Sequence, residues 1–154
     1  MADLKLATGS SFALVASGSA PGNAVVAAAA RSDQGAEYDN STLLEPFGQI
    51  ELVLTFGTGP TAGRRVLVYA IPALNGTDYA EGSSSVTPSQ SHVLGWAYVR
   101  NITTAQRLRV NGPSPDGRLH LPPCKFKILL ANDTDQQISA GWSATLYPAH
   151  WASS

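Results

Sequence analysis

The sequence predicts an all-β protein: a single antiparallel β-sandwich of the jelly-roll kind, with about eight strands. Three observations lead to this prediction. The chain has 154 residues, the length of one domain. Its ten prolines and 14 glycines interrupt it throughout. The short segments between them are rich in β-branched and aromatic residues. The sequence alone leaves an immunoglobulin-like strand order open.

The N-terminal third has the weakest strand pattern. Residues 11–16 fit a short strand. Residues 24–31 fit a helix because alanine favours helices, and they fit a strand equally well around Val25 and Val26. We divide the chain into residues 1–20, an N-terminal arm or first strand, and residues 21–154, the sandwich domain.

Residues 48–56 form the clearest strand. Apolar and mostly polar side chains alternate there, and Ile50, Leu52, Leu54 and Phe56 share one face, which predicts a strand with one buried side. Residues 64–72 are nearly all apolar after Arg65, which predicts a strand at the centre of a sheet.

Four more strands are expected, at residues 92–100, 105–110, 124–131 and 141–147. In residues 92–100 we expect strict alternation, with Val93, Gly95, Ala97 and Val99 opposite Leu94, Trp96 and Tyr98. We expect Trp96 and Trp142 in the core. Residues 74–91 are predicted to be a long surface loop, a class that is often functional.

Composition and charge exclude several classes of partner. The formal net charge is −1 and basic residues are scattered, so we expect no nucleic-acid binding. No stretch approaches the roughly 20 apolar residues that span a bilayer, so we expect no membrane contact. No signal peptide is recognised, which predicts folding in the cytoplasm. Charged residues make up only 14% of the chain, a composition that favours broad contact with a partner.

No motif for catalysis or cofactor binding is recognised, so we expect a protein that is not an enzyme and holds no cofactor or metal. The three histidines, His92, His120 and His150, lack metal-ligand spacing. An enzyme site assembled from distant residues would need a cleft that joins at least two of these histidines and the acids. Four acids lie near one another in the sequence, in a stretch that reads as a solvated loop: Asp33, Glu37, Asp39 and Glu45.

Two other residue types receive a structural interpretation. Cys124 is the only cysteine, so no internal disulfide can form, and we expect it to be a small, buried apolar side chain. Asn-x-Ser/Thr triplets begin at Asn40, Asn75, Asn101 and Asn132. We interpret these asparagines as turn and strand-end residues that bond local backbone, and not as glycan acceptors.

Three segments resemble a known group of proteins. They are Tyr38-Asp-Asn-Ser-Thr42, the run from Val68 to Gly82 containing Pro-Ala-Leu-Asn-Gly-Thr-Asp-Tyr, and the run from Leu121 to Asn132 beginning Leu-Pro-Pro-Cys-Lys-Phe-Lys. In this order they are similar to small jelly-roll structural proteins of tailed bacteriophages, a group with capsid decoration (cement) proteins. Asn75 stands where that group has Asp.

The resemblance implies a virion structural protein without catalytic residues. It implies a decoration subunit on the capsid exterior, assembled in the host cytoplasm. Its partners would be the major capsid protein and further copies of itself, in a homotrimer. A tail-associated protein, or a receptor- or carbohydrate-binding module with exposed aromatic residues on a sheet face or loop rim, is the alternative.

Eight residues are candidates for the interface, in three parts of the chain. They are Leu4, Leu6, Phe12 and Leu14 near the N-terminus, Asn75, Asp78 and Tyr79 in the long loop, and Trp151 near the C-terminus. The first four fit interface anchors on an arm and the first strand of the sandwich equally well.

Overall fold

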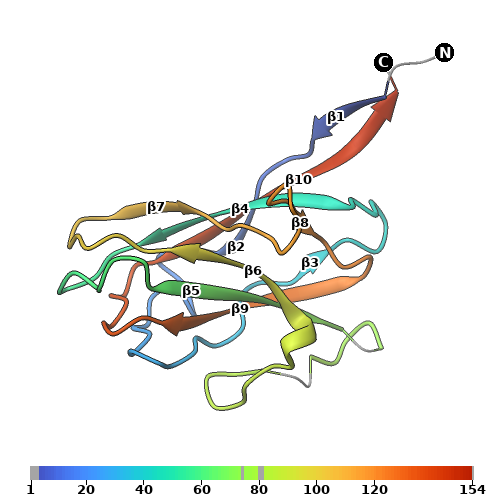
Figure 1. The fold of residues 1–154 in the computed structure, drawn as a ribbon. Coiled ribbons are helices and arrows are strands. Elements are labelled where there is room, and N and C mark those ends of the chain that lie inside the picture. Colours follow the sequence, from blue (N-terminus) through green and yellow to red (C-terminus); the bar gives the residue numbers. More distant parts are fainter. Residues whose placement is uncertain (1–3, 74, 80–81, 154) are drawn as a thin grey trace.

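The computed structural model describes residues 4–73, 75–79 and 82–153 and contains two antiparallel sheets packed face to face (Figure 1). The strands are β1 (Leu4–Thr8), β2 (Phe12–Val15), β3 (Tyr38–Asp39), β4 (Phe47–Leu54), β5 (Arg65–Pro72), β6 (Val93–Tyr98), β7 (Gln106–Arg109), β8 (Leu119–His120), β9 (Lys125–Asp133) and β10 (Ser143–Ser153). One 3-10 helix, η1 (Gln90–His92), precedes β6, and the described residues contain no α-helix.

The strand order is that of a jelly roll. In the first sheet β10 and β4 lie at the centre. β1 and β2 pair with successive parts of one edge of β10, while β7 and β8 pair with successive parts of the far edge of β4. The second sheet has the order β3-β9-β5-β6. If β1–β2 and β7–β8 each count as one interrupted strand, four strands face four, which confirms the predicted fold class and excludes an immunoglobulin-like order.

The core lies between the sheets, where the alternation in β4 and β9 predicts it. Ile50, Leu52 and Leu54 are at most 1% exposed, and Phe126 is fully buried opposite them in the same apolar cluster. Trp142 is also buried, as predicted, and its indole nitrogen donates a hydrogen bond to the carbonyl of Ala24 (3.2 Å).

Residues 24–31 form neither the helix nor the strand that their composition suggests. They run as turns with two isolated bridges, Val26 to Ile138 and Arg31 to Ala131. Ala29 has a positive φ of 56°, which interrupts any regular element. Val26 is the one side chain of this segment that is buried in the core, and backbone hydrogen bonds from Val26 to Ile138 and from Asn132 to Ala30 fix the path of the rest.

The prediction of strict alternation in β6, with Trp96 in the core, is wrong. The register between β5 and β6 shifts so that Leu94 is an extra residue, a β-bulge. Leu94, Ala97 and Val99 therefore fill the inner face. Trp96 lies half-buried on the outer face, opposite Leu67.

Candidate functional site

A two-stranded ribbon projects from the sandwich (Figure 1). β1 pairs with the last five residues of β10 in antiparallel register, from Thr8 opposite Ala149 to Leu4 opposite Ser153. The other edge of β10 pairs with β4 only as far as Ala149, which faces Phe47. From residue 150 onward the ribbon therefore has two edges without a strand partner among the described residues.

A buried carboxylate lies at the root of this ribbon. Glu45 is only 4% exposed, so the expectation that it is solvated is wrong. Its Oε2 accepts a short hydrogen bond from the Tyr38 hydroxyl, and His150 Nδ1 lies 3.5 Å from Oε1. Burial, followed by this hydrogen bond, raises the pKa of Tyr38, which keeps the hydroxyl protonated as a donor.

Asn40 holds the backbone around Glu45. Its Nδ2 donates to the carbonyls of Glu45 and Pro122 (both 2.9 Å), and its Oδ1 accepts from the Glu45 amide (2.8 Å). A hollow of about 390 Å³ opens beside the carboxylate. Phe12, Leu43 and Pro148 contribute to its largely apolar wall. The ribbon therefore leaves the sandwich beside an apolar hollow with an acid in its wall.

The long loop folds back over the outer face of the second sheet. Tyr79 packs against a small apolar cluster there, which is formed by Tyr69, Ile71 and Leu129. Its hydroxyl donates to Glu37 Oε2 (2.6 Å), and the Lys127 ammonium lies 4.4 Å from the centre of its ring. Gln34 Nε2 donates to the carbonyl of Tyr79 (3.2 Å) and to that of Gly82.

The candidate interface residues fall into three environments. Leu14 is fully buried in the core of its own domain, so it is not available to a partner, and Phe12 is half-buried against Tyr38, with ring centres 5.2 Å apart. Tyr79 anchors the loop, whereas Asn75 and Asp78 are exposed at its tip. The remaining three, Leu4, Leu6 and Trp151, belong to the paired backbone of the ribbon, and their side chains lie outside the described part of the chain.

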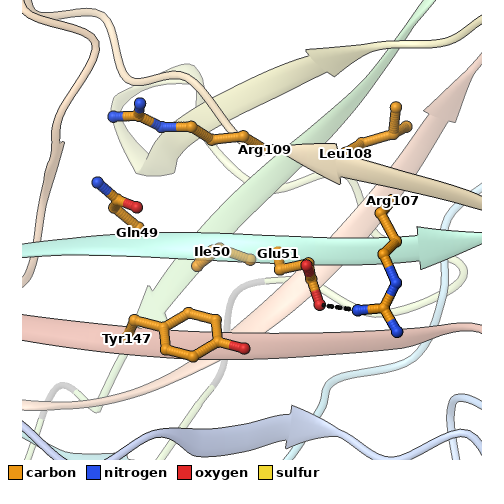
Figure 2. Close-up of a pocket in the computed structure, with 7 residues that line it drawn as sticks. All are labelled: Gln49, Ile50, Glu51, Arg107, Leu108, Arg109 and Tyr147. Atoms are coloured by element: carbon orange, nitrogen blue, oxygen red, sulfur yellow. Dashed lines mark hydrogen bonds and ion pairs between the residues drawn. The ribbon is translucent and has the colours of Figure 1, made fainter.

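The outer face of the first sheet carries a shallow hollow of about 320 Å³ (Figure 2). Arg107 Nη1 and Glu51 Oε1 form an ion pair across β7 and β4 at 2.8 Å. Figure 2 shows Gln49 between Arg109 and the ring of Tyr147. The Arg107–Glu51 pair occupies part of this polar surface.

The histidines and Cys124 form no recognisable catalytic arrangement. His92 and His120 line one hollow of about 120 Å³, and no acid lines it. His150 lies in a different hollow, with Glu45. Burial raises the pKa of the half-buried Cys124, which disfavours its thiolate. Among the described residues no group of three or more His, Cys, Asp or Glu side chains is placed to hold a metal ion.

Comparisons with known proteins add little. No family model and no curated protein matches this chain. Among solved structures, a chain of the "Kashmir bee virus empty particle at acidic pH" is similar over 97% of this chain and 92% of that chain. The sequence identity is 7% and the TM-score is 0.30. The assignment of the fold therefore rests on the strand order described above.

The sequence missed two features of these surfaces. Nothing in the local sequence indicates that Glu45 is buried, because its two side-chain partners, Tyr38 and His150, reach it from β3 and β10. The bulge in β6 turns Trp96 to the same outer face as Tyr98, which is 55% exposed.

Within the described chain, no helix is long and apolar enough to cross a membrane.

Proposed function

We propose that this chain is a non-enzymatic structural protein of a virus particle, a capsid decoration subunit of the tailed-phage kind. It would bind the shell of the major capsid protein from outside and associate with further copies of itself as a trimer. We propose that assembly takes place in the host cytoplasm. The sequence segments that resemble phage decoration proteins support this role, together with the jelly-roll fold.

The observation that carries the proposal is the projecting β1–β10 ribbon. A two-stranded ribbon is marginally stable in water on its own. Its unpaired edges also expose backbone donors and acceptors that can pair with a strand of another chain. A partner strand at either edge would satisfy these groups, so the ribbon is suited to hold a neighbouring subunit or the shell.

The pairing pattern identifies which groups a partner would use. Gly9 N donates to the Pro148 carbonyl (2.8 Å), which makes Thr8 and Ala149 a non-hydrogen-bonded pair. The backbone N–H of Thr8 therefore points away from β10, toward the open edge. Substituting Thr8→Pro removes this outward donor without removing a hydrogen bond inside the ribbon.

The experiment is mass photometry of the purified protein, alone and mixed with undecorated phage capsids. We expect a trimer that saturates the shell at a fixed copy number. Thr8→Pro should weaken association, whereas Thr8→Ala, the matched control that keeps the N–H, should behave as wild type. A monomer that ignores capsids would exclude the proposal, and equal behaviour of Thr8→Pro and wild type would exclude pairing at this edge.

A further inference from the structure

Part of the outer face of the second sheet is not covered by the long loop. The loop packs over Tyr69, Ile71 and Leu129. Beyond this cluster, two cross-strand rows continue across the sheet. The first row is Arg31, Ala131, Leu67 and Trp96, and the second is Asp133, Arg65 and Tyr98. We call this surface, with the neighbouring Arg64, the aromatic face.

Two aromatic side chains lie next to each other at one end of the aromatic face. Trp96 and Tyr98 are two residues apart on β6, so their side chains point to the same side of the sheet. Tyr98 is 55% exposed and Trp96 is half-buried. Flat aromatic surfaces that remain open to water, each with a polar tip, are suited to stack against the C–H faces of sugar rings.

Positive charge surrounds these rings. Two hollows open on this face, of about 280 and 200 Å³, and both are lined by Asp133. Arg64 and Arg65 line the first hollow and Arg31 lines the second. Three arginines and one aspartate therefore line the two hollows, and Asp133 Oδ2 lies 3.2 Å from Arg65 Nε. A second aspartate, Asp135, interacts electrostatically with Arg64. Three arginines against two aspartates leave an excess of one positive charge, which favours an anionic ligand.

One of these arginines has an unused donor. Arg31 Nε is buried and has no hydrogen-bond partner among the described residues. A buried guanidinium N–H without an acceptor is costly, so a movement of the Arg31 side chain that brings Nε to a ligand oxygen would be favourable. The planar guanidinium matches the two oxygens of a carboxylate, and this geometry makes a carboxylate its preferred partner.

We propose that the aromatic face binds an acidic saccharide, a glycan whose sugars carry carboxylates. Trp96 and Tyr98 stack against the sugar rings, while Arg31 and Arg64 bind the carboxylates. The two hollows are small and open, so a single site binds weakly. Many copies on one particle would raise the overall affinity through multivalency, and this step alone rests on the proposed virion role.

A single-stranded nucleic acid is the competing ligand, because it also combines negative charge with rings that stack. Binding of that kind uses a basic groove that follows the phosphate backbone over several nucleotides. Here the arginines flank one short face, and the chain has a formal net charge of −1. The observations therefore favour the saccharide.

The test is a titration of the isotope-labelled full chain, followed by amide chemical shifts. The acidic probes are tetragalacturonate, a hyaluronan tetrasaccharide and sialyllactose, and maltotetraose is the neutral control. We expect at least one acidic probe to bind at about 1 mM and to shift amides of β5, β6 and β9. Tyr98→Ala should weaken that binding about tenfold, and Arg31→Gln should weaken it without loss of fold.

Tyr147→Ala and Arg109→Ala are the matched controls, because they alter the same residue types on the opposite sheet. Both should leave binding unchanged. The inference is overturned if no acidic probe binds, if maltotetraose binds equally, or if a single-stranded oligonucleotide binds this face more tightly. It is also overturned if Tyr98→Ala abolishes capsid binding, since the face would then be a protein contact. If Tyr98→Ala still binds capsids but no longer binds the saccharide, the saccharide site is shown to be independent of the proposed capsid contact.

Discussion

Single buried side chains hold the irregular parts of this protein in place, and Asn132 is the clearest case. It is 1% exposed, and its Nδ2 donates to the carbonyls of Val26 (3.0 Å), Ala27 (3.1 Å) and Gln136 (2.8 Å). Its Oδ1 accepts from the amide (3.2 Å) and hydroxyl (2.7 Å) of Thr134. One amide side chain thus joins residues 26–27 to the turn after β9.

We predict that Asn132→Ala lowers the free energy of unfolding by about 2–4 kcal/mol, because several buried backbone carbonyls lose their donor. Asn101→Ala is the control: it begins a similar Asn-x-Thr triplet but is exposed, so we expect a change within about 0.5 kcal/mol. Urea denaturation measures both. Equal losses in the two variants would contradict the role assigned to Asn132.

At this scale the sequence predicts residue types better than environments. The triplet asparagines were interpreted as residues that bond local backbone, and Asn40 and Asn132 do so. The prediction that Glu45 is solvated is wrong because its burial depends on tertiary contacts, among them His150 from the far end of the chain and Tyr38 from β3. A charged residue in a loop-like stretch has no local signal that distinguishes a buried position from a solvated one.

At the scale of elements, side-chain alternation was the reliable signal. β4 and β9 are long enough for apolar and polar positions to repeat several times, and both were predicted close to their observed bounds. β3 and β8 have two residues each, so they carry no periodic pattern and were missed. The ribbon cannot be predicted from local sequence patterns, because it forms by pairing of β1 with residues 149–153 at the other end of the chain.

The long loop is an element fixed by a few polar contacts, and these are sensitive to acid. The hydrogen bond from Tyr79, followed by that from Lys125, lowers the pKa of Glu37 from its usual 4.5. Because this pKa is lowered in the folded state, the stabilisation is present above about pH 4.5. It is lost as the pH falls through the lower folded-state value.

We therefore predict that protection against hydrogen exchange, corrected for intrinsic rates, decreases in the loop when the pH falls below the folded-state pKa of Glu37. Protection in β4 should not decrease over the same pH range. Tyr79→Phe should loosen the loop at neutral pH, because it removes the donor to Glu37 but keeps the ring over Lys127. Tyr98→Phe is the control, since the exposed Tyr98 hydroxyl makes no hydrogen bond to another residue of the described chain. Unchanged exchange in Tyr79→Phe would show that the hydrogen bond to Glu37 is not needed to hold the loop.

At the scale of the whole molecule, the ribbon and the aromatic face lie on different parts of the surface. The ribbon leaves one end of the sandwich (Figure 1), whereas the aromatic face lies on the outside of the second sheet. A subunit held through its ribbon can therefore keep a sheet face open to solvent. This arrangement would let a decorated particle present many copies of a weak site at once, the geometry in which multivalency is effective.

If the protein associates through the ribbon as proposed, its thermal stability should depend on protein concentration. A partner that binds only the folded state stabilises it by mass action, so the thermal midpoint of an oligomer rises with protein concentration. We predict a rise of about 2–5 °C over a hundredfold concentration range for wild type and for Thr8→Ala, measured by scanning calorimetry. Thr8→Pro should show a smaller rise of the midpoint, because one outward backbone donor of the ribbon is gone. A constant midpoint for wild type would mean that the free protein does not self-associate, and the trimer would then have to form on the capsid alone.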